Sequence, residues 1–228
     1  MNERQDKIVA VVPAAGIGSR MGTEIPKQYL EINGTPILGL TLTILLTHPK
    51  IDKVIVALYP KDTLFSSLPQ ASHPKLHTVV GGGERADSVL ACLEHIEDGA
   101  WALVHDAARP CLTHSDIDKL IASRERFPQG AILAVPVRDT MKRGKGDGTI
   151  EKTVCREQLW QALTPQLFLG AELRGNLSSA LIENAIITDE ASAMEWAGVS
   201  PGLVSGSIEN IKITHPDDLR LAKLFLTN

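Results

Sequence analysis

Short apolar runs alternate along the chain with longer segments in which apolar residues recur at helical spacing. Strands are predicted at 8–12, 53–59, 76–80, 101–104 and 130–135. Helices are predicted at 35–46, 61–68, 115–126, 171–182 and 214–226. The run 8–12 contains three valines and no polar residue, which is typical of a strand buried on both faces. This alternation predicts an α/β fold with a mostly parallel sheet and helices on both faces.

The segment 137–156 breaks this pattern. Polar and apolar residues alternate over 137–154, and glycines gather at the tip, from Gly144 to Gly148. Such a segment predicts a two-stranded ribbon, which is only marginally stable when it is exposed to water on its own. We therefore expect it to pack against another surface, with a loose surface hairpin as the simpler alternative. The length of the chain suits one hydrophobic core, so 1–228 is predicted to form a single domain.

Composition narrows the classes of function. The net charge of −4 disfavours a general binder of nucleic acids or of anionic membranes, because such proteins carry a basic excess. The cysteines Cys92, Cys111 and Cys155 are odd in number and lack metal-type spacing, so we expect a reducing compartment. The polar N-terminus and the short apolar run after it predict neither a signal peptide nor a membrane span, and the cytoplasm is the expected location.

A turn with few side chains follows the first apolar run. Its small residues are Ala14, Ala15, Gly16 and Gly18. Backbone N–H groups in such a turn can closely approach an anion, and Arg20 and Lys27 add positive charge on either side of Pro26. The glycines alone fit an ordinary strand-to-helix turn equally well. The two cations favour a phosphate site.

Two better-known glycine loops do not fit this turn. A dinucleotide fingerprint requires its third glycine one position before Gly22, and no acid ends the strand that follows. A phosphate loop of the G-x-x-x-x-G-K-[ST] type requires a lysine directly after Gly22, where Thr23 stands. A dinucleotide-dependent oxidoreductase is therefore disfavoured.

A second turn rich in glycine follows the strand at 76–80. It contains Gly81, Gly82 and Gly83. Ser88 lies in the first turn of the next helix, where free N–H groups gather. A structural turn is again an alternative, but two such turns at the carboxyl ends of parallel strands favour a ligand crevice.

Two further segments carry charge next to apolar runs. The run 101–104 leads to Asp106, and Arg109 follows after two alanines. A helix N-cap is the structural alternative for Asp106, but Pro110 makes a regular helix there awkward, so a ligand of Mg²⁺ is the preferred interpretation. Lys212 lies within a short apolar run predicted as a strand, 206–214, where a lysine needs a charged partner such as a phosphate.

The motifs in these segments resemble those of a known family. P-A-A-G-x-G-x-R-M followed by P-K (13–27), V-H-D-A-A-R-P (104–110), T-D-E-A-S (188–192) and N-I-K-x-T (210–214) occur in the order typical of 2-C-methyl-D-erythritol 4-phosphate cytidylyltransferases of the non-mevalonate isoprenoid pathway. The resemblance extends from Val11 to Thr214. It implies a Rossmann-like nucleotidyltransferase sheet, with 137–156 as a β-arm that holds a second subunit in a homodimer.

The resemblance also implies a reaction. CMP is transferred from CTP to 2-C-methyl-D-erythritol 4-phosphate, with in-line attack of the acceptor phosphate on the α-phosphorus, release of pyrophosphate and participation of Mg²⁺. Both small-residue turns are implied to bind CTP, the second through its cytosine base. Arg20 and Lys27 are implied to stabilise charge on the transferring group, and Lys212 charge on the α-phosphate. Such chemistry requires alignment and charge neutralisation, and the ionised acceptor phosphate needs no general base.

The remaining implied roles concern the acceptor and the metal. The acceptor residues implied by the resemblance are Thr140, Arg156, Thr164 and Thr188. The resemblance also implies that Arg109 positions a substrate and that Asp106 is the metal ligand. Guanidinium and hydroxyl groups suit a phosphomonoester. Glu209 is implied as a second metal ligand, and an ordinary exposed acid is the alternative.

Two other functions are compatible with parts of this pattern. A ribitol 5-phosphate cytidylyltransferase shares the loop and the fold and differs around the acceptor site. The second is a nucleotide-sugar-binding module that has kept the fold but catalyses no reaction. In such a module we expect the positively charged residues or the aspartate of the ligand crevice to be missing. Because Arg20, Lys27, Asp106 and Lys212 are all present, the enzyme is preferred.

Overall fold

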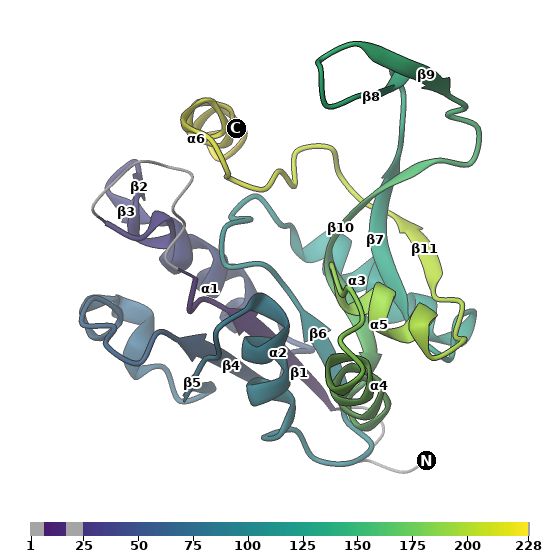
Figure 1. Cartoon of the computed structure of the whole chain (residues 1–228). Helices are drawn as coiled ribbons and strands as arrows, with labels where there is room; N and C mark the ends of the chain where they lie inside the picture. The colour runs from purple at the N-terminus through teal and green to yellow at the C-terminus, as the bar shows by residue number, and fades with distance from the viewer. Residues whose placement is uncertain (1–6, 17–24, 228) are drawn as a thin grey trace.

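The computed structural model describes residues 7–16 and 25–227, and its largest sheet has seven strands (Figure 1). The order in the sheet is β11-β7-β10-β6-β1-β4-β5. The bounds are Ile8–Pro13 (β1), Lys53–Leu58 (β4), Leu76–Val80 (β5), Trp101–Val104 (β6), Ala131–Pro136 (β7), Trp160–Leu169 (β10) and Gly202–Ser205 (β11). Of the neighbouring pairs, the two that include β10 are antiparallel and the others are parallel. The predicted mostly parallel α/β sheet is confirmed.

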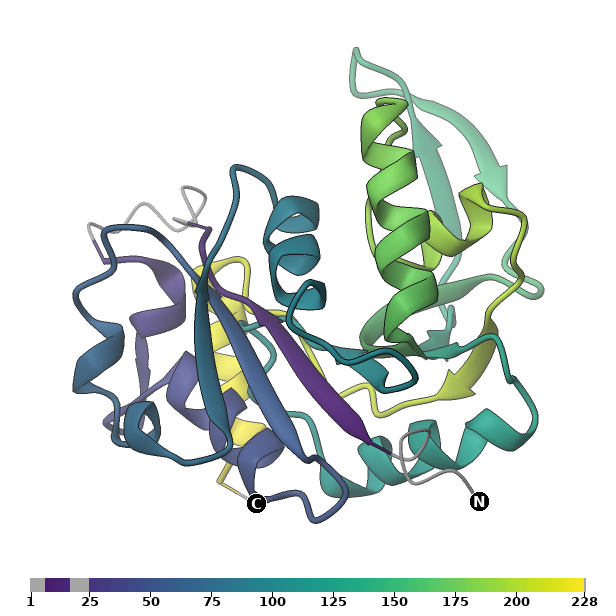
Figure 2. The ribbon, with the colours of Figure 1, turned by 90° about the horizontal axis from the view of Figure 1, so that it is seen from below.

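Helices cover both faces of this sheet. Their bounds are Ile37–Thr47 (α1), Arg85–Leu93 (α2), His114–Ala122 (α3), Gly170–Ile182 (α4), Glu190–Trp196 (α5) and Pro216–Phe225 (α6). Ala10 and Val12 pack in one core with α1 and α3, whereas Val9 and Val11 pack in another with α2, α4 and α5. Figure 2 shows α2 and α4 on one side of the strands and α1 and α3 on the other. Burial on both faces explains why β1 lacks polar residues.

A third, smaller core lies at the C-terminus. Here α6 packs over the short hairpin formed by β2 (Glu31–Ile32) and β3 (Thr35–Pro36), with Ile37, Ile213 and Ala222 buried between them. This contact holds the loop that leads into α6 next to the segment after β6. Within 7–16 and 25–227, none of the helices combines the length and the hydrophobicity that crossing a bilayer requires.

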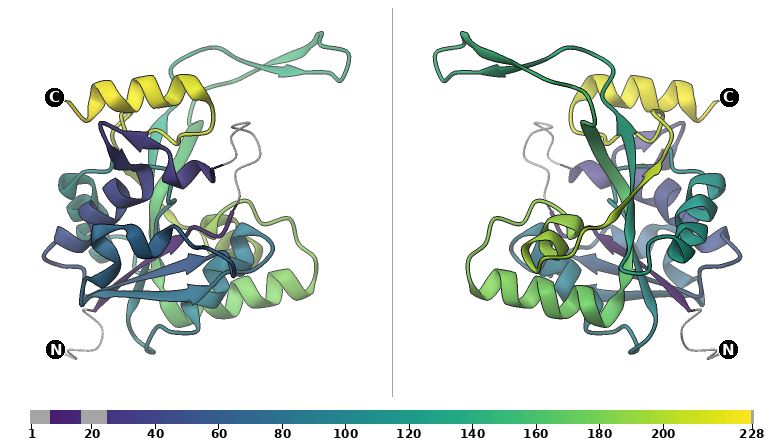
Figure 3. Two further views of the ribbon diagram at one scale, coloured as in Figure 1. Left: turned by 90° about the vertical axis from the view of Figure 1, so that its left-hand side faces the viewer. Right: turned by 90° about the vertical axis from the view of Figure 1, so that its right-hand side faces the viewer.

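The segment 137–156 forms the predicted two-stranded ribbon. Strand β8 (Met141–Gly144) pairs with β9 (Ile150–Val154) in an antiparallel sheet of their own. The ribbon extends well away from the large sheet in Figures 1 and 3. Met141 is 41 % exposed and Ile150 is 62 % exposed. Apolar side chains on a thin exposed ribbon favour a further packing partner.

Two predictions of secondary structure are wrong. The segment 61–68 forms no α-helix; it contains a turn and the 3-10 helix η4 (Phe65–Ser67), followed by η5 (Pro69–Ser72). The Asp62 carboxylate accepts from the N–H groups of Leu64 and Phe65 at 2.9 and 3.0 Å, and this local capping competes with a regular helix. The segment 206–214 forms no strand. The N–H groups of Asn210 and Ile211 bond within the segment, and the Ile213 N–H bonds to the Ala108 carbonyl oxygen in the loop after β6 at 2.9 Å.

The central antiparallel strand β10 was not predicted. It contains Pro165, a residue normally excluded from central strands. The register between β10 and β7 shifts between Ala162 and Gln166, so Pro165 lies where the ladder is interrupted and no backbone donor is missed. The sheet therefore tolerates a residue that, in the sequence, argues against a strand.

Candidate active site

A cavity of about 250 Å³ opens where β1, β5 and β6 end. The turns after these strands supply most of its lining, which consists of Pro13, Ala14, Ala15, Gly16, Lys27, Gln28, Gly82, Gly83, Glu84, Arg85, Ser88, Asp106, Ala107, Ala108 and Lys212. Loops at the carboxyl ends of parallel strands meet at one edge of a sheet, where open α/β sheets bind ligands. The two predicted turns and Asp106 therefore line a single cavity.

The first turn is held by a buried glutamine. Gln28 is 3 % exposed and donates from Nε2 to the Ala14 carbonyl oxygen at 2.8 Å. This bond fixes the backbone at the point where Ala15 and Gly16 line the cavity. Gly18 and Arg20, which the sequence assigns to the same turn, lie outside the described residues.

Lys27 and Lys212 line the same cavity. Lys27 begins the 3-10 helix η3 (Lys27–Tyr29), and its Nζ lies 3.4 Å from the Ile213 carbonyl oxygen. Lys212 comes from the loop before α6, far along the chain. Two of the predicted cations thus lie near one another through the fold alone.

The second turn packs tightly against the first. A Cβ on Gly81 would lie 2.5 Å from the Ala15 Cβ and 2.8 Å from Ser88 Oγ, so this approach requires glycine. Ser88 Oγ accepts from the Gly82 N–H at 3.2 Å and donates to a backbone carbonyl oxygen of the same turn at 3.2 Å. Gly82, Gly83 and Ser88 line the cavity, and Gly81 supports the contact between the turns.

Asp106 follows β6 and is 5 % exposed. Its Oδ1 lies 2.9 Å from Arg85 Nε, and its Oδ2 lies 2.9 Å from Lys212 Nζ and 3.3 Å from Arg109 Nε. Burial by itself would raise the pKa of Asp106, but the charges of Arg85, Lys212 and Arg109 outweigh it and hold the pKa well below its ordinary value. One ionised carboxylate therefore gathers three cations: Arg109 from its own loop, and Arg85 and Lys212 from distant parts of the chain.

His105 and Thr164 orient the backbone of Asp106. The Asp106 N–H donates to Thr164 Oγ at 3.0 Å. His105 Nε2 lies 3.0 Å from the Arg109 carbonyl oxygen, which only accepts, so Nε2 carries a proton. Burial lowers the pKa of His105 to about 4, so the ring is neutral near pH 7, and Nδ1 accepts the Thr164 hydroxyl proton at 3.0 Å. The Thr164 hydroxyl retains one lone pair for a further donor.

A second cavity of about 200 Å³ adjoins the first and shares Arg85, Asp106 and Lys212 with it. The other residues that line it are Arg109, Ala162, Leu163, Thr164, Gln166, Thr188 and Asp189. Arg109, predicted to position a substrate, therefore lies together with Thr164 and Thr188, which are predicted to lie at the acceptor. Thr164 reaches this cavity from the irregular part of β10.

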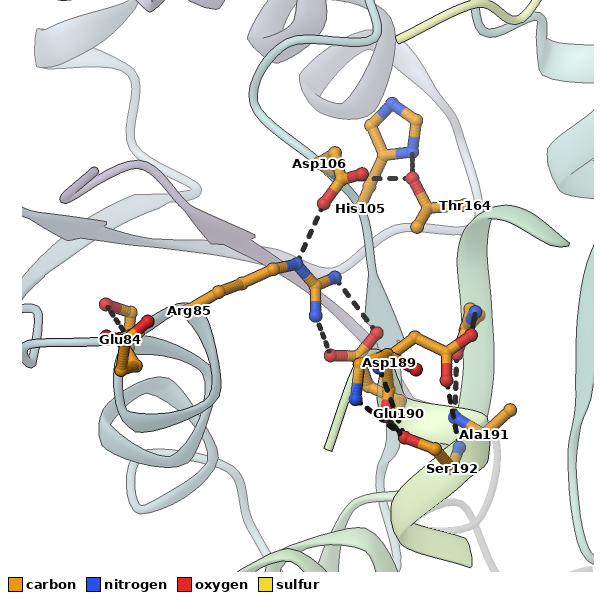
Figure 4. Close-up of polar contacts among 12 residues, drawn as sticks. Glu84, Arg85, His105, Asp106, Thr164, Asp189, Glu190, Ala191 and Ser192 are labelled. Carbon is orange, nitrogen blue, oxygen red and sulfur yellow. Dashed lines mark hydrogen bonds and ion pairs between the residues drawn. The ribbon is translucent and has the colours of Figure 1, made fainter. Parts of the chain in front are cut away.

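Arg85 and Glu190 belong to the site, although the sequence did not indicate them. Arg85 begins α2 directly after the glycine turn, and Glu190 begins α5. Figure 4 shows Arg85 between Asp106 and Glu190, with Nη1 and Nη2 donating to the two Glu190 oxygens at 2.7 and 3.1 Å. An acid in the first turn is also what any helix N-terminus favours, so the residue type of Glu190 carried no separate signal.

Asn210 is a third residue that the sequence did not indicate. It is fully buried, and its side-chain Nδ2 donates to the Thr164 backbone carbonyl oxygen at 2.7 Å. The backbone carbonyl oxygen of Asn210 accepts from Arg109 Nη1 at 2.7 Å. These bonds tie β10, the segment after β6 and the last loop together. Asn210 thereby fixes the loop that carries Lys212.

Three predicted residues lie apart from both cavities. Thr140 and Arg156 are exposed near the base of the arm, where an Arg156 guanidinium N–H donates to the Arg138 carbonyl oxygen. Glu209 is exposed and lines neither cavity. Across the parts of the chain that the structure describes, no three His, Cys, Asp or Glu side chains are grouped so as to hold a metal ion.

Sequence comparison identifies similar proteins over the full chain. The family model described as 2-C-methyl-D-erythritol 4-phosphate cytidylyltransferase matches residues 8–228. A protein of that name from Shewanella sediminis is 75 % identical over 228 residues, which are 100 % of this chain and 97 % of the relative. Another from Shewanella halifaxensis is 68 % identical over 228 residues, which are 100 % of this chain and 99 % of the relative.

Solved structures give the same result for the fold. A crystal structure of 4-diphosphocytidyl-2C-methyl-D-erythritol synthase is similar with a TM-score of 0.84 at 38 % identity, over 97 % of this chain and 98 % of that chain. The crystal structure of 2-C-methyl-D-erythritol 4-phosphate cytidylyltransferase from Francisella tularensis has a TM-score of 0.84 at 36 % identity, over 96 % of this chain and 99 % of that chain.

Proposed function

This chain belongs to the 2-C-methyl-D-erythritol 4-phosphate cytidylyltransferase family, and from that premise we propose how its two cavities bind the substrates. The enzyme transfers CMP from CTP to 2-C-methyl-D-erythritol 4-phosphate in isoprenoid precursor biosynthesis, which yields 4-diphosphocytidyl-2-C-methyl-D-erythritol and pyrophosphate. One observation supports the assignment of the cavities: Arg85, Asp106 and Lys212 line both, so two substrates bound there would meet at these residues.

In this proposal CTP occupies the larger cavity. The triphosphate lies against the first turn, whose small residues are Ala14, Ala15, Gly16 and Gly18. The cytosine lies against the second turn, formed by Gly81, Gly82 and Gly83, with Ser88. Backbone N–H groups of such turns bind anions well, and Arg20, Lys27 and Lys212 neutralise the charge that the transferring group develops.

The acceptor occupies the smaller cavity. Its phosphate oxygen attacks the α-phosphorus, a new P–O bond forms, and the bond from the α-phosphorus to the β-phosphate oxygen breaks to release pyrophosphate. Arg109 and Thr188 contact the acceptor phosphate or hydroxyl groups. The Thr164 hydroxyl donates its proton to His105, so it can only accept a further hydrogen bond. A hydroxyl group of the bound 2-C-methyl-D-erythritol 4-phosphate donates to its remaining lone pair.

We assign Mg²⁺ to Asp106. This ion commonly takes one or two carboxylates together with substrate phosphate oxygens, so the buried, ionised carboxylate of Asp106, which lines both cavities, fits it. When bound there, Mg²⁺ supplies positive charge that neutralises the triphosphate. Glu209 is the family's second candidate ligand, and its exposed side chain outside the cavities makes Asp106 the principal one.

The proposal includes a homodimer in the cytoplasm, formed through the arm 137–156. Thr140 and Arg156 are too exposed to bind an acceptor within a solvent-excluded site of their own. A second copy that places its arm against the smaller cavity would add a guanidinium and a hydroxyl to Arg109 and Thr188, which suits a phosphomonoester. The exposed Met141 and Ile150 would be covered by the same contact.

The function is tested with a panel of acceptors. Pyrophosphate release is measured with CTP, Mg²⁺ and either 2-C-methyl-D-erythritol 4-phosphate or ribitol 5-phosphate. We expect kcat/KM for the first acceptor to be higher by about 10²-fold or more, because the cavity would leave polar groups unpaired with the wrong polyol. Equal turnover would contradict the assigned selectivity, and release with neither acceptor would contradict the activity.

A further inference from the structure

Arg85 uses three of its five guanidinium N–H groups to bind two carboxylates. Nε donates to Asp106 Oδ1 at 2.9 Å, and Nη1 and Nη2 donate to the two oxygens of Glu190 at 2.7 and 3.1 Å. Both carboxylates are buried, with Glu190 2 % exposed. The side chain of Arg85 crosses from α2 to α5 (Figure 4), and Arg85 lines both cavities.

The position of Arg85 is unfavourable for the helix that carries it. Arg85 is the first residue of α2, and the dipole of a helix disfavours a cation at its N-terminus. Burial would also lower the pKa of Arg85, but the charges of Glu190 and Asp106 outweigh it and hold the pKa above its ordinary range. A buried ion pair stabilises a fold little compared with apolar packing, so stability alone does not account for the contact.

Glu190 is connected to the acceptor cavity by its neighbours. Thr188 and Asp189 directly precede it and line that cavity. Gln166 holds the same segment, because its Nε2 donates to Asp189 Oδ2 at 2.9 Å and its Oε1 accepts from the Ala191 N–H at 2.8 Å. A bidentate contact to Glu190 therefore fixes the backbone that presents Thr188.

We propose that Arg85 is a positioning residue that couples the two substrate cavities. It fixes the Asp106 carboxylate at the nucleotide cavity and the segment 188–190 at the acceptor cavity. The inference rests on the proposed function, since it requires a nucleotide in one cavity and a phosphorylated acceptor in the other. Lysine cannot replace Arg85, because its three N–H groups radiate from one nitrogen. They cannot form the planar fork that serves Glu190 while a separate nitrogen, Nε in arginine, serves Asp106.

The test separates the two cavities kinetically. KM for CTP, KM for 2-C-methyl-D-erythritol 4-phosphate and kcat are measured by pyrophosphate release for the wild type, Arg85→Gln, Arg85→Lys and Glu190→Gln. For both Arg85 variants we expect kcat/KM to fall roughly 10- to 100-fold, as is usual for groups that orient an active-site carboxylate. For Glu190→Gln, which leaves the Arg85–Asp106 contact in place, we expect a raised acceptor KM and an unchanged CTP KM.

Arg174→Gln is the matched control. Arg174 on α4 is similarly exposed, at 33 % against 28 % for Arg85, and it binds Asp98 away from the cavities, so its loss should change neither KM. Should Arg85→Gln leave Glu190 buried without a partner and therefore fail to fold, Glu190→Gln still tests whether the contact between Arg85 and Glu190 positions the acceptor cavity. Full activity of Arg85→Lys, or equal rises of both KM values in Glu190→Gln, would overturn the proposal. A wild type that releases no pyrophosphate would instead overturn the proposed function.

Discussion

The two cavities and the arm hold their charged residues in opposite ways. Asp106 and Glu190 are buried and bonded to cations, most of them from other parts of the chain, at distances of 2.7 to 3.3 Å. Arg156 and the neutral Thr140 are exposed at the base of a ribbon whose strands pair with each other. In the cavities, one chain suffices to place its charges in advance, which is the condition for electrostatic stabilisation of a transition state.

The difference indicates what each part of the molecule needs. The cavities lie on the large sheet, where packing on both faces holds the strand ends that carry Asp106 and the glycine turns. The arm has no comparable core, so the geometry of its side chains depends on the surface it meets. We therefore expect changes in the cavities to affect chemistry within one chain, and changes in the arm to depend on assembly.

Removing a cavity lysine should have the largest effect. Lys212→Ala leaves Asp106 paired with Arg85 and Arg109, so the fold should remain intact. Turnover should fall about 10²- to 10³-fold, as for other electrostatic contacts to a transition state. Steady-state pyrophosphate release measures it, with the exposed Lys223→Ala on α6 as the control. Near-normal turnover of Lys212→Ala would remove the lysine from the assigned role.

Changing Arg156 should reveal whether the arm acts in trans. Arg156→Ala alone should raise the acceptor KM roughly 10- to 100-fold, because a forked charged contact to phosphate is lost. Arg156→Ala is then mixed with an inactive Lys27→Ala variant so that the subunits exchange. In the mixed dimer, the intact arm of the Lys27→Ala subunit meets the intact cavity of the Arg156→Ala subunit. Activity should return to roughly a quarter of the sites in a two-fold symmetric dimer. No recovery after verified exchange would show that each arm serves its own chain.

Replacing 141–154 by a short Gly-Ser turn should separate assembly from nucleotide binding. We expect a monomer by analytical ultracentrifugation, a rise of the acceptor KM no larger than that of Arg156→Ala, and binding of CTP by calorimetry close to that of the intact chain. The reason is that no arm residue lines the larger cavity. A wild-type chain that is already monomeric at all concentrations would contradict the role of the arm in the dimer.

The last expected effect concerns stability and leaves catalysis aside. The free energy of unfolding should depend on pH through residues of the large sheet and not of the arm. Burial lowers the pKa of His105 to about 4 and also lowers that of His48, so the unfolded chain binds protons more readily than the folded one. The contribution of these histidines to the free energy of unfolding is therefore fully present above the unfolded pKa near 6.5. The contribution of His105 should fall by about 3 kcal/mol as the pH decreases to about 4.

Urea unfolding at several pH values measures this slope. The arm contains no histidine between 137 and 156, so the variant without 141–154 should show the same slope as the intact chain. His48→Asn should reduce the slope, since an amide does not titrate and its oxygen can replace Nδ1 as the acceptor of the Lys50 N–H. A slope that disappears with the arm would contradict the assignment to buried histidines.

The pattern of apolar and polar residues predicted those elements whose formation depends on a few adjacent residues. Apolar runs such as 8–12 predicted strands buried on both faces, and the polar alternation with a glycine tip predicted the ribbon. The pattern failed at Asp62, where side-chain capping replaced a helix. A second failure lies at 206–214, where apolar residues resemble a strand although the backbone forms local turns and one bond to the loop after β6. It also failed at β10, because a proline is tolerated at a break in the ladder.

The sequence by itself determined the fold class and the identity of the turns that approach a ligand, because strand burial and the need for glycine are properties of a few adjacent residues. Only the tertiary structure decided which charges meet. Arg85, Asp106, Glu190 and Lys212 are far apart in the chain, and no one-dimensional pattern contains the distances between them. The presence of an acid at position 190 has two explanations: it suits the N-terminus of a helix, and it pairs with Arg85. Residue type alone could not decide between them, since both favour an acid at the same position.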